Sequence, residues 1–170
     1  MSDKEFTTVE FARFFTSNLI FCDVTFEDTA AFFRWIATTL EQSGYVRPTF
    51  YRAITEREAN YPTGLATATG GVAIPHVDPE HIRKTFIAVV RPQLPIAFAP
   101  MGGGPGDEPI QAKLIFVLGM MRGGLQVQVL QKLMGMLADR ATMDRLFAAE
   151  DKEQILLIIN DSFKNPKGAM

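Results

Sequence analysis

Apolar residues along the chain form two patterns, short continuous runs and stripes that repeat at helical spacing. The runs at residues 19–24, 85–90 and 113–118 are rich in β-branched and aromatic side chains, which predicts strands buried on both faces of a sheet. Residues 96–98 are a candidate for a further short strand. Helical stripes separate these runs, so we expect an α/β fold with a mixed, mostly buried sheet flanked by helices on both faces.

The first helical stripe follows the run at residues 19–24 and stops at Ser43 and Gly44, where glycine can adopt the left-handed conformation that closes a helix. Thr25 and Asp28 resemble a capping box, which predicts that the helix begins at residue 25. The apolar stripe consists of Phe26, Ala30, Phe33, Ala37 and Leu40. We therefore expect an amphipathic helix that packs on the sheet.

Four further segments have the pattern of helices. One begins near Pro48, which a first turn tolerates, and must end before Pro62. Another follows the Gly123-Gly124 pair and runs to about Ala138, with leucines on one face. Two shorter helices are expected over residues 143–149 and 153–160, the second of them after an aspartate cap.

Two segments have the composition of loops. Residues 61–71 are rich in Gly and Thr, which predicts an irregular connection, and residues 101–109 contain a run of glycines that predicts a flexible loop tip. The second segment has neither the G-x-G-x-x-G nor the G-x-x-x-x-G-K-[ST] spacing that cradles nucleotide phosphates. We therefore set nucleotide binding aside.

Composition and charge favour an ordinary soluble domain. With 170 residues, 47% hydrophobic and 21% charged, we expect a single domain over residues 1–170, with an N-terminal arm or helix at 1–18 and a frayed tail at 164–170. The net charge of −2 and the absence of a Lys/Arg cluster argue against nucleic-acid binding. We see no signal peptide and no apolar run of bilayer length, which predicts a cytoplasmic protein without direct membrane insertion.

The single cysteine, Cys22, excludes an internal disulfide. It lies in a strand-like run with no basic residue beside it that would lower the pKa of its thiol, so we expect a buried and inert side chain.

Two polar residues interrupt the helical apolar stripes. Arg57 lies three residues after Ile54, where the pattern requires a core residue. Either its stem packs inward while its head reaches water or a carboxylate, or its guanidinium binds an anion such as phosphate. Gln126 lies four residues before Leu130, in a first helical turn whose unpaired N–H groups favour an anion. The alternative for Gln126 is a helix-start residue that faces solvent.

His76 ends the strand-like run at residues 72–76 and is the first candidate for chemistry. Ligands of α/β sheets gather beyond the carboxyl ends of strands, and an imidazole titrates near neutrality, so His76 could act as nucleophile, base or ligand. A structural role remains open. A zinc site shared with His81 is a further alternative, although Pro79 interrupts any common helical face. A serine hydrolase is not expected, because the chain has no G-x-S-x-G motif.

Four motifs together resemble the enzyme IIA domain of the fructose/mannitol type (type 2) in bacterial phosphotransferase systems. They are Glu-Arg-Glu at residues 56–58, Pro-Thr-Gly at 62–64, Gly-Val-Ala-Ile-Pro-His at 71–76 and the leucine-rich helix at 130–137, within a resemblance that covers residues 21–160. This resemblance implies a phosphotransferase component, a histidine phosphocarrier. Such a carrier accepts a phosphoryl group from the phosphohistidine of HPr and passes it to a cysteine of enzyme IIB during sugar uptake. We expect no cofactor and no metal ion.

The resemblance also implies roles for single residues. His76 would be the phosphoryl acceptor, and Arg57 would stabilise the phosphoryl group. Many members have a second active-site histidine where this chain has Gln126, and glutamine can donate a hydrogen bond but cannot carry a proton charge. Gln126 and residues 61–64 resemble the galactitol-type branch, which favours galactitol or a related polyol or hexose. The alternative is a regulatory module of the nitrogen type, in which phosphorylation switches a partner protein.

Overall fold

The computed structural model describes residues 11–164, in which six strands form one mixed sheet. The order along the sheet is β1-β4-β6-β3-β2, with β5 paired to β6 beside this path. β1 is parallel to β4 and β3 is parallel to β6, whereas the β4–β6, β2–β3 and β5–β6 pairs are antiparallel. The strands are β1 (Ile20–Val24), β2 (Gly64–Thr67), β3 (Gly70–Ala73), β4 (Phe86–Pro92), β5 (Ile96–Phe98) and β6 (Ile110–Gly119).

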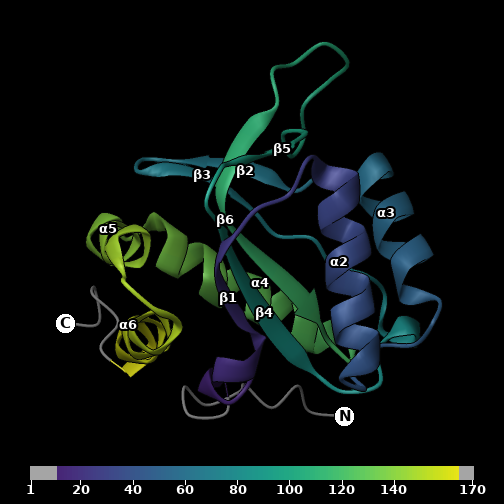
Figure 1. The fold of residues 1–170 in the computed structure, drawn as a ribbon, viewed down its shortest axis with the longest axis horizontal. Helices are drawn as coiled ribbons and strands as arrows, with labels where there is room; N and C mark the ends of the chain where they lie inside the picture. Colours follow the sequence, from purple (N-terminus) through teal and green to yellow (C-terminus); the bar gives the residue numbers. More distant parts are fainter. Residues whose placement is uncertain (1–10, 165–170) are drawn as a thin grey trace.

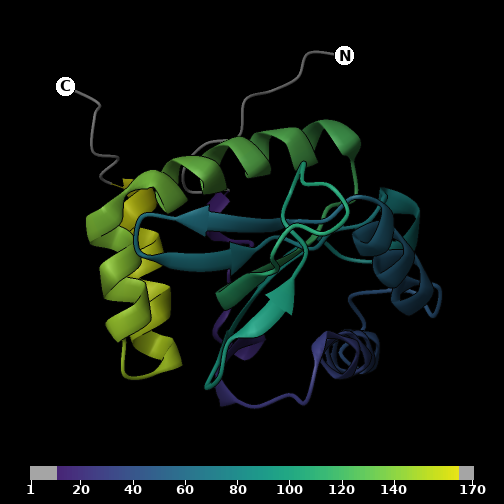
Figure 2. The ribbon, with the colours of Figure 1, turned by 90° about the horizontal axis from the view of Figure 1, so that it is seen from above.

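Helices cover both faces of this sheet, which confirms the predicted fold class. The helices are α2 (Thr29–Gln42), α3 (Phe50–Asn60), α4 (Gly123–Ala138), α5 (Arg140–Ala148) and α6 (Lys152–Lys164). Figure 1 shows α2 and α3 on one side of the molecule and α5 and α6 on the other, and Figure 2 shows α4 and α2 on opposite faces of the sheet. No helix within residues 11–164 is both long and apolar enough to cross a membrane.

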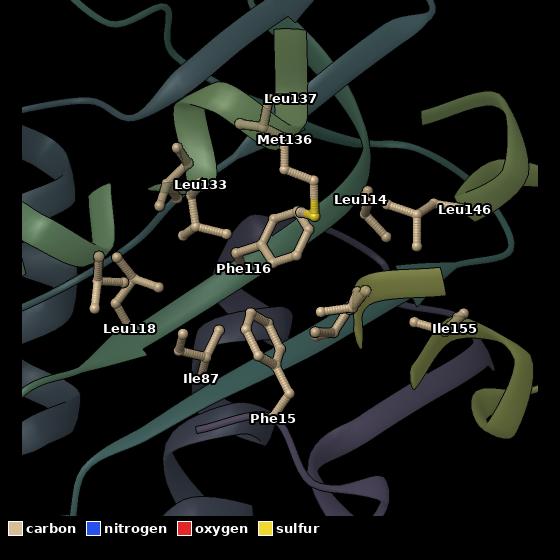
Figure 3. Close-up of a cluster of buried hydrophobic side chains, with 14 of the residues drawn as sticks. Phe15, Ile87, Leu114, Phe116, Leu118, Leu133, Met136, Leu137, Leu146 and Ile155 are labelled. Atoms are coloured by element: carbon tan, nitrogen blue, oxygen red, sulfur yellow. The ribbon is translucent and has the colours of Figure 1, made fainter. Parts of the chain in front are cut away.

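The continuous apolar run of β6 is explained by two separate cores. Phe116 and Leu118 point into the core covered by α4, α5 and α6, together with Ile87 of β4 (Figure 3). Ile115 and Val117 point into the opposite core, which is covered by α2 and α3. Since successive side chains of a strand face opposite sides, a strand buried on both faces needs an apolar residue at every position.

The predicted strands are present, but one predicted loop is wrong. Residues 64–73 form the β2–β3 hairpin, in which Gly64 pairs with Ala73 and Thr67 with Gly70. Two of its glycines, Gly64 and Gly71, allow the backbone of a neighbouring segment to approach closely. A Cβ on Gly71 would lie 2.3 Å from the Gln111 carbonyl oxygen, and a Cβ on Gly64 would lie 2.7 Å from that of Ala99.

The first predicted helix begins later than the sequence pattern indicates. Asp28 is the cap of α2, because its side chain accepts a hydrogen bond of 2.8 Å from the Ala31 N–H. The Thr25 hydroxyl instead donates to the Gln93 side chain at 3.0 Å, so the capping box at Thr25 is wrong. The predicted end is confirmed, since Gly44 closes the helix with φ 82°.

The other helices are close to expectation. α3 lies within its predicted limits, and α4 ends where expected but begins at the glycine pair itself. α5 begins three residues early because Asp139 caps it by accepting from the Ala141 N–H. α6 follows its predicted cap, Asp151, and continues beyond residue 160. The N-terminal arm and the tail fall largely outside the described residues, although Phe11 lies against Phe163 with ring centroids 4.4 Å apart.

Gly119 and Gly135 provide a matched test of this packing. A Cβ on Gly119, at the end of β6, would lie 2.1 Å from the buried ring of Phe86, so Gly119→Ala is expected to lower the free energy of unfolding by about 1–3 kcal/mol. A Cβ on Gly135 of α4 would meet nothing within 4 Å, and Gly135→Ala is expected to raise it by about 0.5–1 kcal/mol. Urea denaturation measures both changes, and equal stabilities would contradict the assigned register of β6 against β4.

Candidate functional site

The loop that follows β3 carries His76 to one edge of the sheet. The strand expected to reach residue 76 ends at Ala73, because Pro75 has no N–H to donate to a ladder. The Leu118 N–H of β6 donates to the Pro75 carbonyl at 3.0 Å, and His76 forms an isolated bridge with Leu118. His76 therefore lies near the carboxyl ends of two parallel strands, β3 and β6.

A backbone carbonyl fixes the orientation of the imidazole. Nδ1 of His76 lies 2.7 Å from the Ile74 carbonyl oxygen. Since a carbonyl only accepts, Nδ1 carries the hydrogen of this bond, and Nε2 of the neutral ring has a free lone pair. Burial lowers the pKa of His76 and outweighs the bond to Ile74, which raises it; Arg57 lowers the pKa further and Asp78 raises it. The ring is therefore kept neutral to lower pH than an exposed histidine.

The pKa of His76 gives a prediction for pH dependence. The pKa in the folded chain lies below the ordinary value of 6.5, so the unfolded chain binds more protons as the pH falls below that value. The stability contribution is fully present above pH 6.5 and is lost as the pH falls through the folded-state pKa. NMR titration of the His76 ring protons is expected to give a midpoint below 6.5, and a midpoint above it would contradict this environment.

Arg57 lies in the last turn of α3 and reaches the loop that carries His76. Its Nη1 is 3.3 Å from Oδ1 of Asp78, and its guanidinium lies 5.6 Å from the centre of the Tyr61 ring. The side chains of Arg57 and Asp78 are 33% and 65% exposed, and exposed ion pairs contribute little to stability. Breaking the ion pair to Asp78 therefore costs little free energy, and Arg57 can exchange that carboxylate for an anionic ligand. The two alternatives for Arg57, a carboxylate partner and anion binding, do not exclude each other.

Gln126 lies in the helix that follows β6, the strand bridged by His76, but it does not bond to His76. It is half-buried in the first turn of α4, which begins four residues after β6 ends at Gly119. Its backbone N–H donates to the Arg122 carbonyl at 3.3 Å. Within residues 11–164 no hydrogen bond joins the Gln126 side chain to His76. Of the two residues expected near His76, Arg57 lies close enough for its charge to lower the pKa of His76. Gln126 is connected to the site only through its place in the helix after β6.

The two histidines have separate environments. Nδ1 of His81 lies 2.8 Å from the Thr49 hydroxyl, and its Nε2 lies 3.4 Å from Glu80. Among the described residues, no three His, Cys, Asp or Glu side chains are grouped to hold a metal ion. The Cys22 thiol is half-buried, and burial raises its pKa more than Arg91 lowers it, which does not favour a nucleophilic thiolate.

Sequence reasoning did not single out two polar residues, Glu58 and Thr63, that are linked by hydrogen bonds to the loop before His76. Glu58 accepts hydrogen bonds from the backbone and the hydroxyl of Thr63, and the Thr63 hydroxyl accepts from the Ile74 N–H. Burial raises the pKa of Glu58, and the bonds from Thr63 partly offset this. The motifs at residues 56–58 and 62–64 contain both side chains, but only the fold shows that they meet the loop before His76.

Comparison with known proteins gives the same assignment as the motifs. The family model of the phosphoenolpyruvate-dependent sugar phosphotransferase system, EIIA 2, matches residues 13–162. The galactitol-specific EIIA component of Escherichia coli K12 is 24% identical over 130 residues, which are 76% of this chain and 85% of that protein.

Two solved structures share the fold. The complex of the mannitol enzyme IIA with phosphorylated enzyme IIB from Escherichia coli superposes with a TM-score of 0.68 at 21% identity, covering 86% of this chain and 97% of that one. The nitrogen regulatory protein IIA-Ntr from Neisseria meningitidis superposes with a TM-score of 0.71 at 22% identity, covering 87% of this chain and 97% of that one. With the family model matched over most of its length, this chain belongs to the type 2 enzyme IIA family of the phosphoenolpyruvate-dependent sugar phosphotransferase system.

Proposed function

We propose that the chain is a phosphocarrier that accepts a phosphoryl group on Nε2 of His76 from the phosphohistidine of HPr and passes it to a cysteine of enzyme IIB. The observation that carries this proposal is the 2.7 Å bond between Nδ1 of His76 and the Ile74 carbonyl. This bond directs the lone pair of the neutral ring to Nε2, and the lowered pKa keeps that lone pair unprotonated at neutral pH.

Both steps of the transfer, onto His76 and from His76 to enzyme IIB, are displacements at phosphorus. The Nε2 lone pair of His76 forms a new N–P bond while the N–P bond of the donor histidine breaks and its electron pair returns to the donor ring. In the second step a thiolate of enzyme IIB forms an S–P bond, and the bond to His76 breaks. Catalysis of such transfers consists mostly of positioning and charge stabilisation. Arg57 supplies a guanidinium for the phosphoryl oxygens, and the Gln126 amide supplies a neutral hydrogen-bond donor.

Sugar transport and regulation remain two candidate contexts for this transfer. The similarity to the galactitol-specific EIIA component, together with Gln126, supports uptake of galactitol or a related polyol or hexose. The structural similarity to IIA-Ntr supports the second candidate, a regulatory module in which phosphorylation switches a partner protein. Both contexts are consistent with a protein that acts in the cytoplasm, without a nucleic-acid partner or membrane insertion.

Labelling with phosphoenolpyruvate tests the proposal directly. Purified chain is incubated with HPr, its phosphoenolpyruvate-driven donor and labelled phosphoenolpyruvate, with the mannitol enzyme IIA as positive control. We expect one acid-labile phosphoryl group per chain, which a galactitol-type enzyme IIB removes. Label that no enzyme IIB removes would favour the regulatory candidate. No label, under conditions that label the mannitol protein, would contradict the phosphocarrier function.

A further inference from the structure

Thr63 is a buried polar residue whose backbone N–H and side-chain hydroxyl are both hydrogen-bonded. It is 3% exposed and lies in the connection between α3 and β2. Its N–H donates to Oε1 of Glu58 at 2.8 Å, and its hydroxyl lies 3.0 and 2.9 Å from the two carboxyl oxygens of Glu58. The Ile74 N–H donates to the same hydroxyl at 3.2 Å.

The chemistry of a hydroxyl gives this chain of bonds a direction. The Thr63 hydroxyl has one hydrogen, which it donates to Glu58, and its lone pairs remain to accept from the Ile74 N–H. Ile74 lies just beyond the end of β3 and is 1% exposed, so its N–H has neither a ladder partner nor water. Without Thr63 this buried donor would be unsatisfied, which is costly.

The same peptide segment holds the imidazole. The Ile74 carbonyl accepts from Nδ1 of His76, and the next carbonyl, that of Pro75, accepts from the Leu118 N–H of β6. Three hydrogen bonds therefore hold residues 74–76. One joins this segment to Thr63, one joins it to β6, and one joins the Ile74 carbonyl to the His76 ring. The tie to Thr63 fixes the Ile74 residue whose carbonyl selects the tautomer of His76.

We propose that Glu58 and Thr63 are positioning residues for His76, which hold the Ile74 backbone so that its carbonyl keeps the hydrogen on Nδ1 and leaves Nε2 free. They act through the backbone and do not touch the phosphoryl group. The consequence for transfer rests on the proposed function, whereas the consequence for the tautomer concerns the unphosphorylated protein. These hydrogen bonds, from Glu58 through Thr63 to the Ile74 backbone, extend the site from the loop after β3 to the last turn of α3.

The test measures tautomer and transfer separately. Ring nitrogen shifts in ¹⁵N NMR are expected to show the Nδ1–H tautomer in the wild type and a loss of that preference in Thr63→Val, which keeps the shape and removes the hydroxyl. Phosphoryl transfer from HPr is expected to slow about tenfold to a hundredfold in Thr63→Val, as for other groups that orient a functional histidine. Thr63→Ser restores the hydroxyl and is expected to restore both properties.

Thr142→Val is the matched control. Thr142 is also buried, at 6% exposed, and its hydroxyl donates to Oδ2 of Asp139 at 2.8 Å in the cap of α5. The change removes the same hydroxyl–carboxyl bond, so it is expected to lower thermal stability while leaving the His76 tautomer and the transfer rate unchanged.

Glu58 provides the second arm if Thr63→Val does not fold. Glu58→Met removes the acceptor and is expected to reproduce the change of tautomer, whereas Glu58→Gln keeps a carbonyl oxygen and is expected to retain most of the wild-type preference. An unchanged tautomer in both Thr63→Val and Glu58→Met would overturn the proposal. A chain that HPr never labels would overturn the phosphocarrier function alone. The His76 tautomer would still show whether Glu58 and Thr63 position the ring.

Discussion

Replacing His76 by alanine is expected to reduce labelling by HPr to background. The substitution removes Nε2, and the one other histidine of the chain, His81, has both ring nitrogens occupied by Thr49 and Glu80. The fold is expected to survive, because the half-buried ring makes one hydrogen bond, to the Ile74 carbonyl, and loss of such a bond costs about 1 kcal/mol. Labelling and thermal melting measured on the same preparation separate loss of the acceptor from loss of the fold.

His81→Ala is the matched control, because these are the two histidines of the chain. It removes an imidazole from the short 3-10 helix at Pro79–His81, five residues after His76, together with its bond to the Thr49 hydroxyl. We expect His81→Ala to lose some thermal stability. We expect HPr to label it to the same extent as the wild type. Label that persists on His76→Ala, or that disappears from His81→Ala while the protein stays folded, would contradict the assignment of the acceptor.

The sequence predicts this fold well where a pattern is local. An unbroken apolar run from Leu114 to Leu118 in β6 is enough to indicate burial on both faces. The structure confirms this, since Phe116 lies in one core and Val117 in the core on the opposite face. The β2–β3 hairpin was missed because its strands are short and rich in small residues. The glycines in it are explained by neighbours far along the chain, such as Gln111 beside Gly71, which no local pattern contains.

The same limit applies to the candidate site. Arg57 could be singled out because a cation stands on an apolar stripe, and the structure places its charge near His76. The contact of Thr63 with the Ile74 N–H could not be foreseen, because it depends on the hairpin that folds residue 63 back against residue 74. For Gln126 the pattern indicates the correct helix and turn, but a helical stripe does not fix where a long side chain ends.

Replacing Arg57 by methionine is expected to slow phosphoryl transfer about 10²- to 10³-fold, the usual effect of removing one preorganised donor from a transition state. Methionine keeps an unbranched stem on the helix, and the lost ion pair to Asp78 is exposed, so stability is expected to change by less than about 1 kcal/mol. Arg57 also lowers the pKa of His76, so the titration midpoint of His76 is expected to rise in the variant. Single-turnover transfer from HPr measures the first effect, and NMR titration measures the last.

Arg52→Met supplies the control on the same helix. Arg52 pairs with Glu56 at 2.9 Å, and its side chain is 86% exposed on the face of α3 away from the core. Loss of this cation is expected to leave transfer and the His76 midpoint at their wild-type values, which excludes a general effect of charge on docking of HPr. An Arg57→Met variant that transfers at the wild-type rate would return Arg57 to a structural role, and one that unfolds would show that its stem belongs to the core. A slow, folded variant with a raised His76 midpoint has one physical explanation, a guanidinium that acts on both the imidazole and the group it carries.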